Sequence, residues 1–265
     1  MSATEYLLHE RQSLIRKRLA DDGRVIAADL AQQFAISEDT IRRDLREMAA
    51  AGLLKRVYGG ALPVQSTDDN SILSRMSIKP ERKDALAKAA VNRISAGMTL
   101  FIDAGTTNLA IAQAIPPGLK LTVITNAPLI AAALMDRPDI AVVVIGGQLD
   151  RGSGAVLGSK AIQDAANFNP DLCILGSCGF EVDRGVTASF PEEAEFKRFI
   201  ALRSRSVMAA VTNDKLGVPA PCAVIPMEKC DHVVIEQDAD PHYAEAIARA
   251  GANVIRAGGY QTGGK

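Results

Sequence analysis

The sequence is poor in the residues on which metal and redox chemistry depend. Its 265 residues include four cysteines and three histidines. No two cysteines form a C-x-x-C pair, and His9, His232 and His242 are scattered along the chain. This spacing gives little support to a zinc site or a serine triad, and buried, reduced cysteines are the better interpretation. We predict neither a metal ion nor a cofactor.

Long apolar runs are also missing. None approaches the roughly 18 residues that a membrane span needs, and the N-terminal MSATEYLLHERQ lacks the basic and apolar blocks of a signal peptide. We therefore expect a cytoplasmic protein without membrane contact. With 48% apolar and 23% charged residues, the composition is that of an ordinary folded chain, and the length suits a small domain beside a larger one.

The formal net charge of −1 gives no indication of a nucleic-acid partner, but it conceals a local imbalance. Residues 11–62 contain ten Lys and Arg against seven Asp and Glu. This excess is modest, so the placement of the charges has to carry the argument.

Residues 28–48 have the pattern of two short helices joined by a tight turn. Ser37 is suited to cap the second helix, and Ile41 and Leu45, four residues apart, can seat it on a core. A helix that enters the major groove reads bases with its N-terminal residues, and arginine can bind guanine or phosphate. The alternative, a merely solvated charged face, is weakened by the basic segment that comes after this helix in the chain. The predicted contacts are Ser37, Glu38, Thr40, Arg42, Arg43 and Arg46.

A basic hairpin comes after the second helix. Residues 54–58 alternate in character and lead into Gly59-Gly60, a two-residue turn signal. A hairpin in this position is typical of a wing, which lies against the DNA backbone or the minor groove. Lys55, Arg56 and Tyr58 are its candidate contacts.

Residues 11–62, above all SEDTIRRDLREMAAAGLLKRVYGGAL, resemble the N-terminal signature of the DeoR family of bacterial sugar-metabolism regulators. The resemblance covers the whole winged helix and implies that the helix from Ser37 to Met48 reads an operator, usually for repression. We accordingly expect a winged helix-turn-helix domain over residues 1–62 and a linker over residues 63–80, with an extended stretch near Ile72.

Residues 81–265 predict a larger α/β domain. Helical patterns alternate with continuous apolar strands at residues 99–102, 121–124, 140–145, 171–175, 207–211 and 232–235. Such strands predict a mostly parallel sheet that helices cover on both faces.

Ligands of open α/β sheets collect at the carboxyl ends of the strands. Asp103-Ala104-Gly105-Thr106-Thr107 follows the first strand and opens a helix, which is the arrangement of a small phosphate cradle, although an ordinary strand-to-helix turn would look alike. Further strand ends supply polar residues or glycines. The candidate effector residues are Asp103, Gly105, Thr106, Thr107, Thr125, Asn126, Gly146, Gly147, Glu192 (or Glu193), Lys197 and Lys215.

Together these segments resemble the DeoR-family sensor domain, whose fold is similar to ribose-5-phosphate isomerase and the CoA transferases. The resemblance implies a phosphorylated sugar as effector, with Lys215 offering a cation to its phosphate. The sequence departs from the family's usual aspartate-serine-serine-lysine run, because Thr212-Asn213-Asp214 precedes Lys215 here.

The leading functional prediction is a homo-oligomeric transcriptional repressor, a dimer or tetramer, that binds double-stranded operator DNA and is released by a phosphorylated sugar. Two alternatives compete. One is a sugar-phosphate isomerase with a DNA-binding appendage, in which Asp103, Glu192 or Glu193 and Lys215 would act as acid, base and clamp. The other is an interaction module that does not bind DNA.

Overall fold

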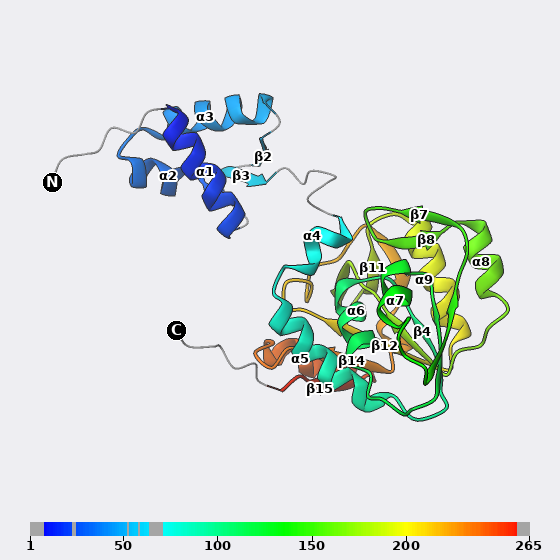
Figure 1. Ribbon diagram of the computed structural model, residues 1–265. Helices are drawn as coiled ribbons and strands as arrows, with labels where there is room; N and C mark the ends of the chain where they lie inside the picture. Colours follow the sequence, from blue (N-terminus) through cyan, green and yellow to red (C-terminus); the bar gives the residue numbers. More distant parts are fainter. Residues whose placement is uncertain (1–7, 23–24, 52, 58, 64–70, 259–265) are drawn as a thin grey trace. The chain divides into compact units, whose positions relative to one another are not determined.

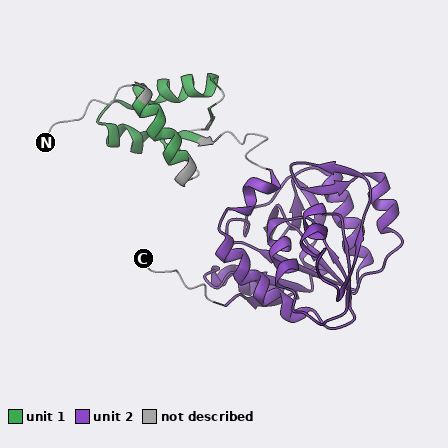
Figure 2. Cartoon of the chain, in the orientation of Figure 1, with its two compact units in different colours: residues 1–67 green, residues 68–265 purple. Residues whose placement is uncertain are grey.

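The chain folds as two units, residues 1–67 and residues 68–265, each with its own hydrophobic core (Figure 2). A computed structural model describes residues 8–22, 25–51, 53–57, 59–63 and 71–258 (Figure 1). None of the described helices combines the length and the apolar character that crossing a membrane requires.

The described part of the first unit comprises three helices and a small antiparallel sheet. Its elements in order are α1 (Leu8–Asp22), β1 (Val25–Ile26), α2 (Ala27–Phe34), α3 (Glu38–Ala50), β2 (Leu54–Val57) and β3 (Gly60–Pro63). Strands β2 and β3 form the predicted hairpin, and β1 pairs with the other side of β3. Gly60 permits this pairing, since a Cβ atom there would lie 2.0 Å from the carbonyl oxygen of Val25.

Helix α3 begins where the sequence predicts. The hydroxyl oxygen of Ser37 accepts a hydrogen bond from the backbone N–H of Thr40 at 3.2 Å, which satisfies a donor of the first turn. Ile41, Leu45 and Met48 recur at a helical spacing and are buried in the core of the first unit.

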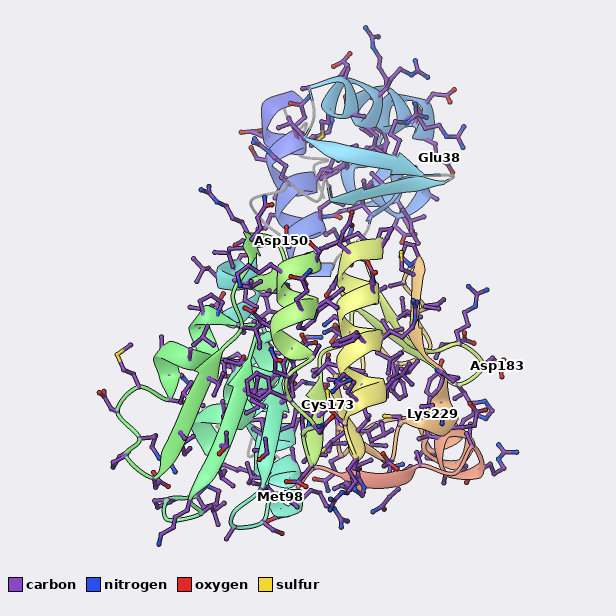
Figure 3. The ribbon with its side chains drawn as sticks, turned by 90° about the vertical axis from the view of Figure 1, so that its right-hand side faces the viewer. Glu38, Met98, Asp150, Cys173, Asp183 and Lys229 are labelled. Carbon is purple, nitrogen blue, oxygen red and sulfur yellow. The ribbon has the colours of Figure 1, made fainter. Side chains whose placement is uncertain are left out.

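The second unit is built on a parallel seven-stranded sheet, which confirms the predicted α/β class. Every neighbouring pair in the order β15-β14-β12-β9-β4-β5-β6 is parallel. The strands are β4 (Thr99–Ile102), β5 (Leu121–Thr125), β6 (Ile140–Val144), β9 (Leu172–Leu175), β12 (Ser206–Val211), β14 (His232–Ile235) and β15 (Asn253–Arg256). Continuous apolar character predicts six of these strands, because it is typical of strands covered on both faces, as at the fully buried Cys173 in β9 (Figure 3). Strand β15, whose end residues are exposed and polar, was not predicted.

Helices lie on both faces of this sheet (Figure 1). One face carries α5 (Pro80–Ala90), α6 (Thr106–Ala114) and α7 (Pro128–Ala133), which pack against one another in turn. The opposite face carries α8 (Ser159–Ala165) and α9 (Pro191–Arg203), and α10 (Pro241–Arg249) packs against β15.

Smaller elements supplement the sheet. They are the hairpin of β7 (Gln148–Asp150) and β8 (Ala155–Leu157), the antiparallel sheet of β10 (Gly179–Glu181), β11 (Gly185–Ala188) and β13 (Cys222–Ile225), and the 3-10 turns Val91–Arg93 and Met227–Lys229. The sequence patterns singled out none of these.

The expectation of an extended stretch near Ile72 is wrong. Helix α4 (Ile72–Met76) occupies that position, within the second unit. Ser71 caps the helix by accepting the N–H of Ser74 at 3.2 Å, and Ile72 is buried beside Gly154. A β-branched residue favours strands, but here the cap and a partner distant in the sequence decide the conformation.

Candidate functional site

The exposed face of α3 carries the predicted DNA contacts. The Arg42 side chain is 54% exposed and pairs with Glu38 at 2.7 Å, and that of Arg43 is 76% exposed and lies 3.4 Å from Glu47. Arg46 is also exposed, whereas the Ser37 and Thr40 hydroxyls are hydrogen-bonded to each other at 2.9 Å. The face therefore presents three guanidinium groups, two of them held by carboxylates of the same helix.

The wing is only partly described. Arg56 in β2 is exposed, as a backbone contact would require. Lys55 has its backbone in β2, but its side chain lies outside the described part of the structure, and Tyr58 lies outside the described residues altogether.

A buried ion pair, which the sequence did not point to, fixes α3 in the first unit. Arg11 of α1 donates to both carboxylate oxygens of Asp44, at 2.9 and 3.2 Å, and Asp44 is 3% exposed. Asp44 follows Ile41 by three residues and precedes Met48 by four, so it lies on the buried stripe of the helix. That position was the available signal, and counting Asp44 only in the local charge balance missed it.

In the second unit, the carboxyl ends of β4 and β9 form a topological switch point. From β4 the chain continues to β5 and β6 on one side, whereas from β9 it continues to β12, β14 and β15 on the other. Open α/β sheets bind ligands in the crevice at such a point. The loops there are residues 103–105 after β4 and residues 176–178 after β9.

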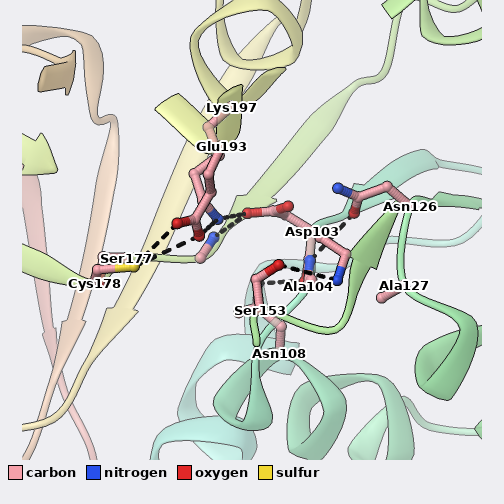
Figure 4. Close-up of polar contacts among 12 residues, drawn as sticks. Asp103, Ala104, Asn108, Asn126, Ala127, Ser153, Ser177, Cys178, Glu193 and Lys197 are labelled. Atoms are coloured by element: carbon pink, nitrogen blue, oxygen red, sulfur yellow. Dashed lines mark hydrogen bonds and ion pairs between the residues drawn. The ribbon is translucent and has the colours of Figure 1, made fainter. Parts of the chain in front are cut away.

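A buried ionic cluster occupies this edge (Figure 4). Lys197 of α9 donates to Asp103 Oδ2, which also accepts the N–H of Gly176 at 2.9 Å. Glu193 Oε1 lies 3.3 Å from the same ammonium, and Cys178 Sγ lies 3.5 Å from both Glu193 carboxylate oxygens. Burial alone would lower the pKa of Lys197, but the charges of Asp103 and Glu193 outweigh it and raise that pKa. Lys197 is therefore held as a cation.

The cluster leaves two buried polar atoms without a partner among the described residues, Asp103 Oδ1 and Asn126 Nδ2. Asn126 is fully buried, and its Oδ1 accepts the N–H of Ala104 at 3.2 Å, which directs the amide toward the loop after β4 (Figure 4). An unused carboxylate oxygen on the loop after β4 and an unused amide N–H on the loop after β5 together match a hydroxyl group, which donates to the first and accepts from the second.

The N-terminus of α6 lies beside these atoms. Gly105 precedes the helix with φ of 153°, and no side chain caps the first turn, to which Thr106 and Thr107 belong. Uncapped N–H groups at the positive end of a helix dipole favour an anion.

Several predicted site residues make contacts that support the fold. Thr125 Oγ1 donates to the Ile102 carbonyl at 2.6 Å and accepts the N–H of Ala127 at 3.0 Å. Gly147 leaves room for the Leu157 carbonyl, which a Cβ atom would approach to 2.9 Å. The N–H of Gly146 donates to Asp164 at 3.1 Å. Of the two glutamates, Glu192 is exposed and Glu193 is the one in the cluster.

Lys215 lies in the loop after β12, and its ammonium donates to the Ser177 carbonyl at 2.7 Å. Burial, followed by the charges of Arg75 and Lys197, lowers its pKa. A second buried lysine, Lys83 of α5, is 9% exposed and was not among the predicted residues. Lys83 precedes Leu86 by three residues and Ala87 by four, so it lies on the same buried face of α5 as these two residues. That helical spacing could have identified Lys83 as buried.

The described residues contain no group of three His, Cys, Asp or Glu side chains placed to hold a metal ion. The four cysteines are unpaired. Cys173 and Cys230 are buried as expected, whereas Cys178 and Cys222 are only half-buried. Burial raises the pKa of the Cys230 thiol to about 12.

Two family models match the chain. The DeoR-like helix-turn-helix domain matches residues 11–67, and the DeoR C terminal sensor domain matches residues 78–237. Both predicted halves of the resemblance are confirmed.

Curated relatives match over most of their length. The chain is 32% identical to the HTH-type transcriptional regulator GlpR of Haloferax volcanii over 248 residues, which cover 93% of this chain and 96% of the relative. It is 33% identical to the Glycerol-3-phosphate regulon repressor of Escherichia coli strain K12 over 208 residues, 78% of this chain and 82% of the relative. It is 30% identical to the HTH-type transcriptional regulator GolR of Listeria innocua, with coverage of 86% and 90%.

Solved structures match more weakly. Ribose 5-phosphate isomerase A of Methanocaldococcus jannaschii gives a TM-score of 0.38 at 14% identity and covers 52% of this chain and 54% of that one. The full-length sorbitol operon regulator SorC of Klebsiella pneumoniae gives 0.36 at 8% identity, with 78% and 90% covered. At these scores neither likeness supports an argument about function.

Proposed function

Because this chain belongs to the DeoR family of transcriptional regulators, we propose that its first unit binds an operator and that its second unit releases it when a phosphorylated metabolite binds at the β4–β9 switch point. The chain is a DNA-binding regulator rather than an isomerase, in keeping with its named relatives. The regulated genes serve carbohydrate or glycerol-phosphate metabolism.

The observation that carries the effector proposal is the pair of unpartnered buried atoms at the switch point. Asp103 Oδ1 and Asn126 Nδ2 provide one acceptor and one donor, which suits a hydroxyl of a sugar or a polyol. The uncapped N-terminus of α6 suits a phosphate, and Lys215 offers a nearby cation. A ligand with both groups, a phosphorylated sugar or polyol, satisfies all three features. One relative is named as a repressor of the glycerol-3-phosphate regulon, which is consistent with this class.

The buried ionic cluster supports this site without forming it. Lys197 neutralises one oxygen of Asp103 and so keeps the loop after β4 in place. The cluster thereby leaves the other oxygen free for ligand. In this proposal Asp103 and Asn126 recognise hydroxyls, Lys197 positions Asp103, and Gly105, Thr106 and Thr107 receive the phosphate.

The DNA proposal depends on the exposed guanidinium face of α3. Arg42, Arg43 and Arg46 are available to base edges and phosphates, and the wing adds Arg56. Two copies of the chain would present two reading helices to two operator half-sites, which is the reason to expect a homo-oligomer.

The test combines DNA binding with a panel of metabolites. The full chain is titrated onto fluorescent duplex DNA from upstream of its own gene, and the bound complex is challenged with glycerol 3-phosphate, ribose 5-phosphate and fructose 6-phosphate. The unphosphorylated compounds are the controls. We expect at least one phosphorylated compound to lower DNA affinity about 5- to 150-fold, the usual range of coupling between sites.

Two variants connect that response to the site. Asn126→Ala removes the unpartnered donor and should blunt the response while leaving DNA affinity without metabolite unchanged. Asn92→Ala, an exposed position just after α5, is the matched control. If the metabolite releases Asn126→Ala from DNA as readily as the wild type, the effector binds elsewhere. If the wild-type protein binds neither the DNA nor any of the metabolites, the whole proposal is contradicted.

A further inference from the structure

Three cationic side chains from separate elements meet near the switch point. Arg75 comes from α4, Lys83 from α5 and Lys215 from the loop after β12. Helix α4 packs against α6, the helix whose N-terminus is uncapped, and α5 packs against α6 as well. The three cations therefore border the same edge of the second unit as the Asp103 loop.

Their hydrogen bonds are made to backbone carbonyls rather than to carboxylates. Lys83 donates to the Arg75 carbonyl, Lys215 to that of Ser177 at 2.7 Å, and Arg75 Nη2 to that of Gly152 at 2.9 Å. Arg75 Nε is buried without a partner among the described residues. A carbonyl satisfies a donor but does not neutralise its charge, so the cluster retains its positive charge.

The charges act on one another. Burial is the main reason that the pKa of Lys83 is lowered, and Lys215 and Arg75 lower it further. At Lys83 the charge of Asp214 opposes them, and this residue is exposed and lies 3.8 Å from Lys79. Cations that are held together against their repulsion favour an anion of two charges among them.

Helix α4 is docked through few contacts. Ile72 lies against Gly154, where a Cβ atom would be 2.8 Å from the isoleucine side chain, and Arg75 holds the same turn through Gly152. The other apolar side chain of its first turn, Leu73, is 65% exposed. Among the described elements, α4 is the first that follows the wing strand β3 in the chain.

We propose that Arg75, Lys83 and Lys215 together bind the phosphate group of the effector and that the bound anion fastens α4 to the rest of the second unit. This rests on the proposed function and adds to it the residues that recognise the charge and the element that responds. The phosphate removes the repulsion that opposes the docking of α4, because it draws Arg75 and Lys83 to one ligand. The effector is thereby sensed at the start of the second unit, next in sequence to the DNA-binding unit.

The first test uses inorganic phosphate and the full chain. Phosphate should raise the thermal unfolding temperature relative to chloride at equal ionic strength, since it binds only the folded state. Arg75→Gln and Lys83→Met should each weaken phosphate binding about 10- to 100-fold, the usual worth of a hydrogen bond to a charged group. Methionine keeps the apolar stem that burial of Lys83 requires, so folding is retained. Lys88→Met, an exposed lysine of the same helix, should bind as the wild type does.

The second test measures the docking of α4. Hydrogen exchange of its backbone amides should slow when phosphate is added to the wild type. Gly154→Ala should abolish this slowing, because its Cβ displaces Ile72. Gly97→Ala is the matched control: its φ of 80° is close to the 72° of Gly154, but no atom lies within 4 Å of the added Cβ.

The outcomes separate the two proposals. If phosphate does not stabilise the wild type, or stabilises Arg75→Gln and Lys83→Met equally well, the three cations are not the site. If phosphate binds but the backbone amides of α4 exchange at an unchanged rate, the proposal that phosphate fastens α4 is wrong. A metabolite that releases operator DNA from wild type and both variants alike overturns this inference and leaves the proposed function standing.

Discussion

Lys197 and Asp103 form a buried ion pair that joins helix α9 to the end of strand β4. Their side chains are 3% and 1% exposed, and Glu193 shares the ammonium at 3.3 Å. The pair spans 94 positions of sequence and connects elements on the two sides of the switch point. The loop that we assign to the effector thus depends on a residue from the opposite side of the sheet.

Lys197→Met should therefore destabilise the second unit strongly. Removing one partner leaves two buried carboxylates uncompensated, and such losses amount to about 3–5 kcal/mol. Urea denaturation of the full chain, followed by circular dichroism, measures the change. Arg184→Met is the control, because Arg184 is 68% exposed and 3.5 Å from Glu181, a surface pair worth about 1 kcal/mol or less. Equal losses in the two variants would show that the buried pair has no special role.

The Arg11–Asp44 pair leads to a similar prediction for the first unit. Asp44→Asn keeps the shape of the side chain but removes the charge that accepts from Arg11 at 2.9 Å, which should cost on the order of 3 kcal/mol. Operator affinity should fall as well, although Asp44 is buried, because α3 loses its ion pair with α1. Asp29→Asn, an exposed position, should change stability by less than about 1 kcal/mol. Undiminished DNA affinity at a temperature where Asp44→Asn remains folded would argue against a positioning role.

The sequence predicts the parts of this fold that local patterns determine. Strands such as β4 and β9 are continuous apolar runs because both faces are covered, and Ser37 caps α3 through a contact three residues away. Both signals are contained in a few neighbouring residues.

Contacts between distant residues escape such patterns. Lys83 and Asp44 are charged residues on helices, which is the usual composition of a solvated face, and only their place on a buried stripe distinguishes them. Helix α4 depends on Gly154, far along the chain, and so its sequence alone indicated an extended linker. The Asp103 loop was predicted as a site, but its pairing with Lys197 was not, since both residues were assigned directly to the effector.

Arg43 provides the prediction for DNA. Its side chain is 76% exposed on α3, and a contact to a DNA phosphate would release a counterion. Arg43→Ala should weaken operator binding roughly tenfold, about 1.4 kcal/mol, and reduce the slope of log K against log salt by about 1. Fluorescence anisotropy at four salt concentrations measures both quantities. Arg249→Ala, an exposed arginine of the second unit, should leave both unchanged, and an unaltered slope for Arg43→Ala would exclude a phosphate contact.

The lowered pKa of Lys83 should make both stability and anion binding depend on pH. Burial, then Lys215 and Arg75, lower its pKa below the ordinary 10.5, against the weaker effect of Asp214. Between the lowered pKa and 10.5 the unfolded chain binds more protons than the folded one, so the free energy of unfolding rises with pH in that window. Phosphate affinity should instead fall as pH rises, because the folded protein loses the charge on Lys83 as pH passes through the lowered pKa.

Unfolding and phosphate binding, measured as the pH rises toward 10.5, should thus change in opposite directions. Lys83→Met should weaken both dependences, since it removes one of the two lysines whose pKa is lowered, Lys83 and Lys215. Lys88→Met should follow the wild type. Phosphate affinity that falls with pH equally in wild type and Lys83→Met would assign the titration to another group, and a free energy of unfolding that falls in this window would contradict the lowered pKa itself.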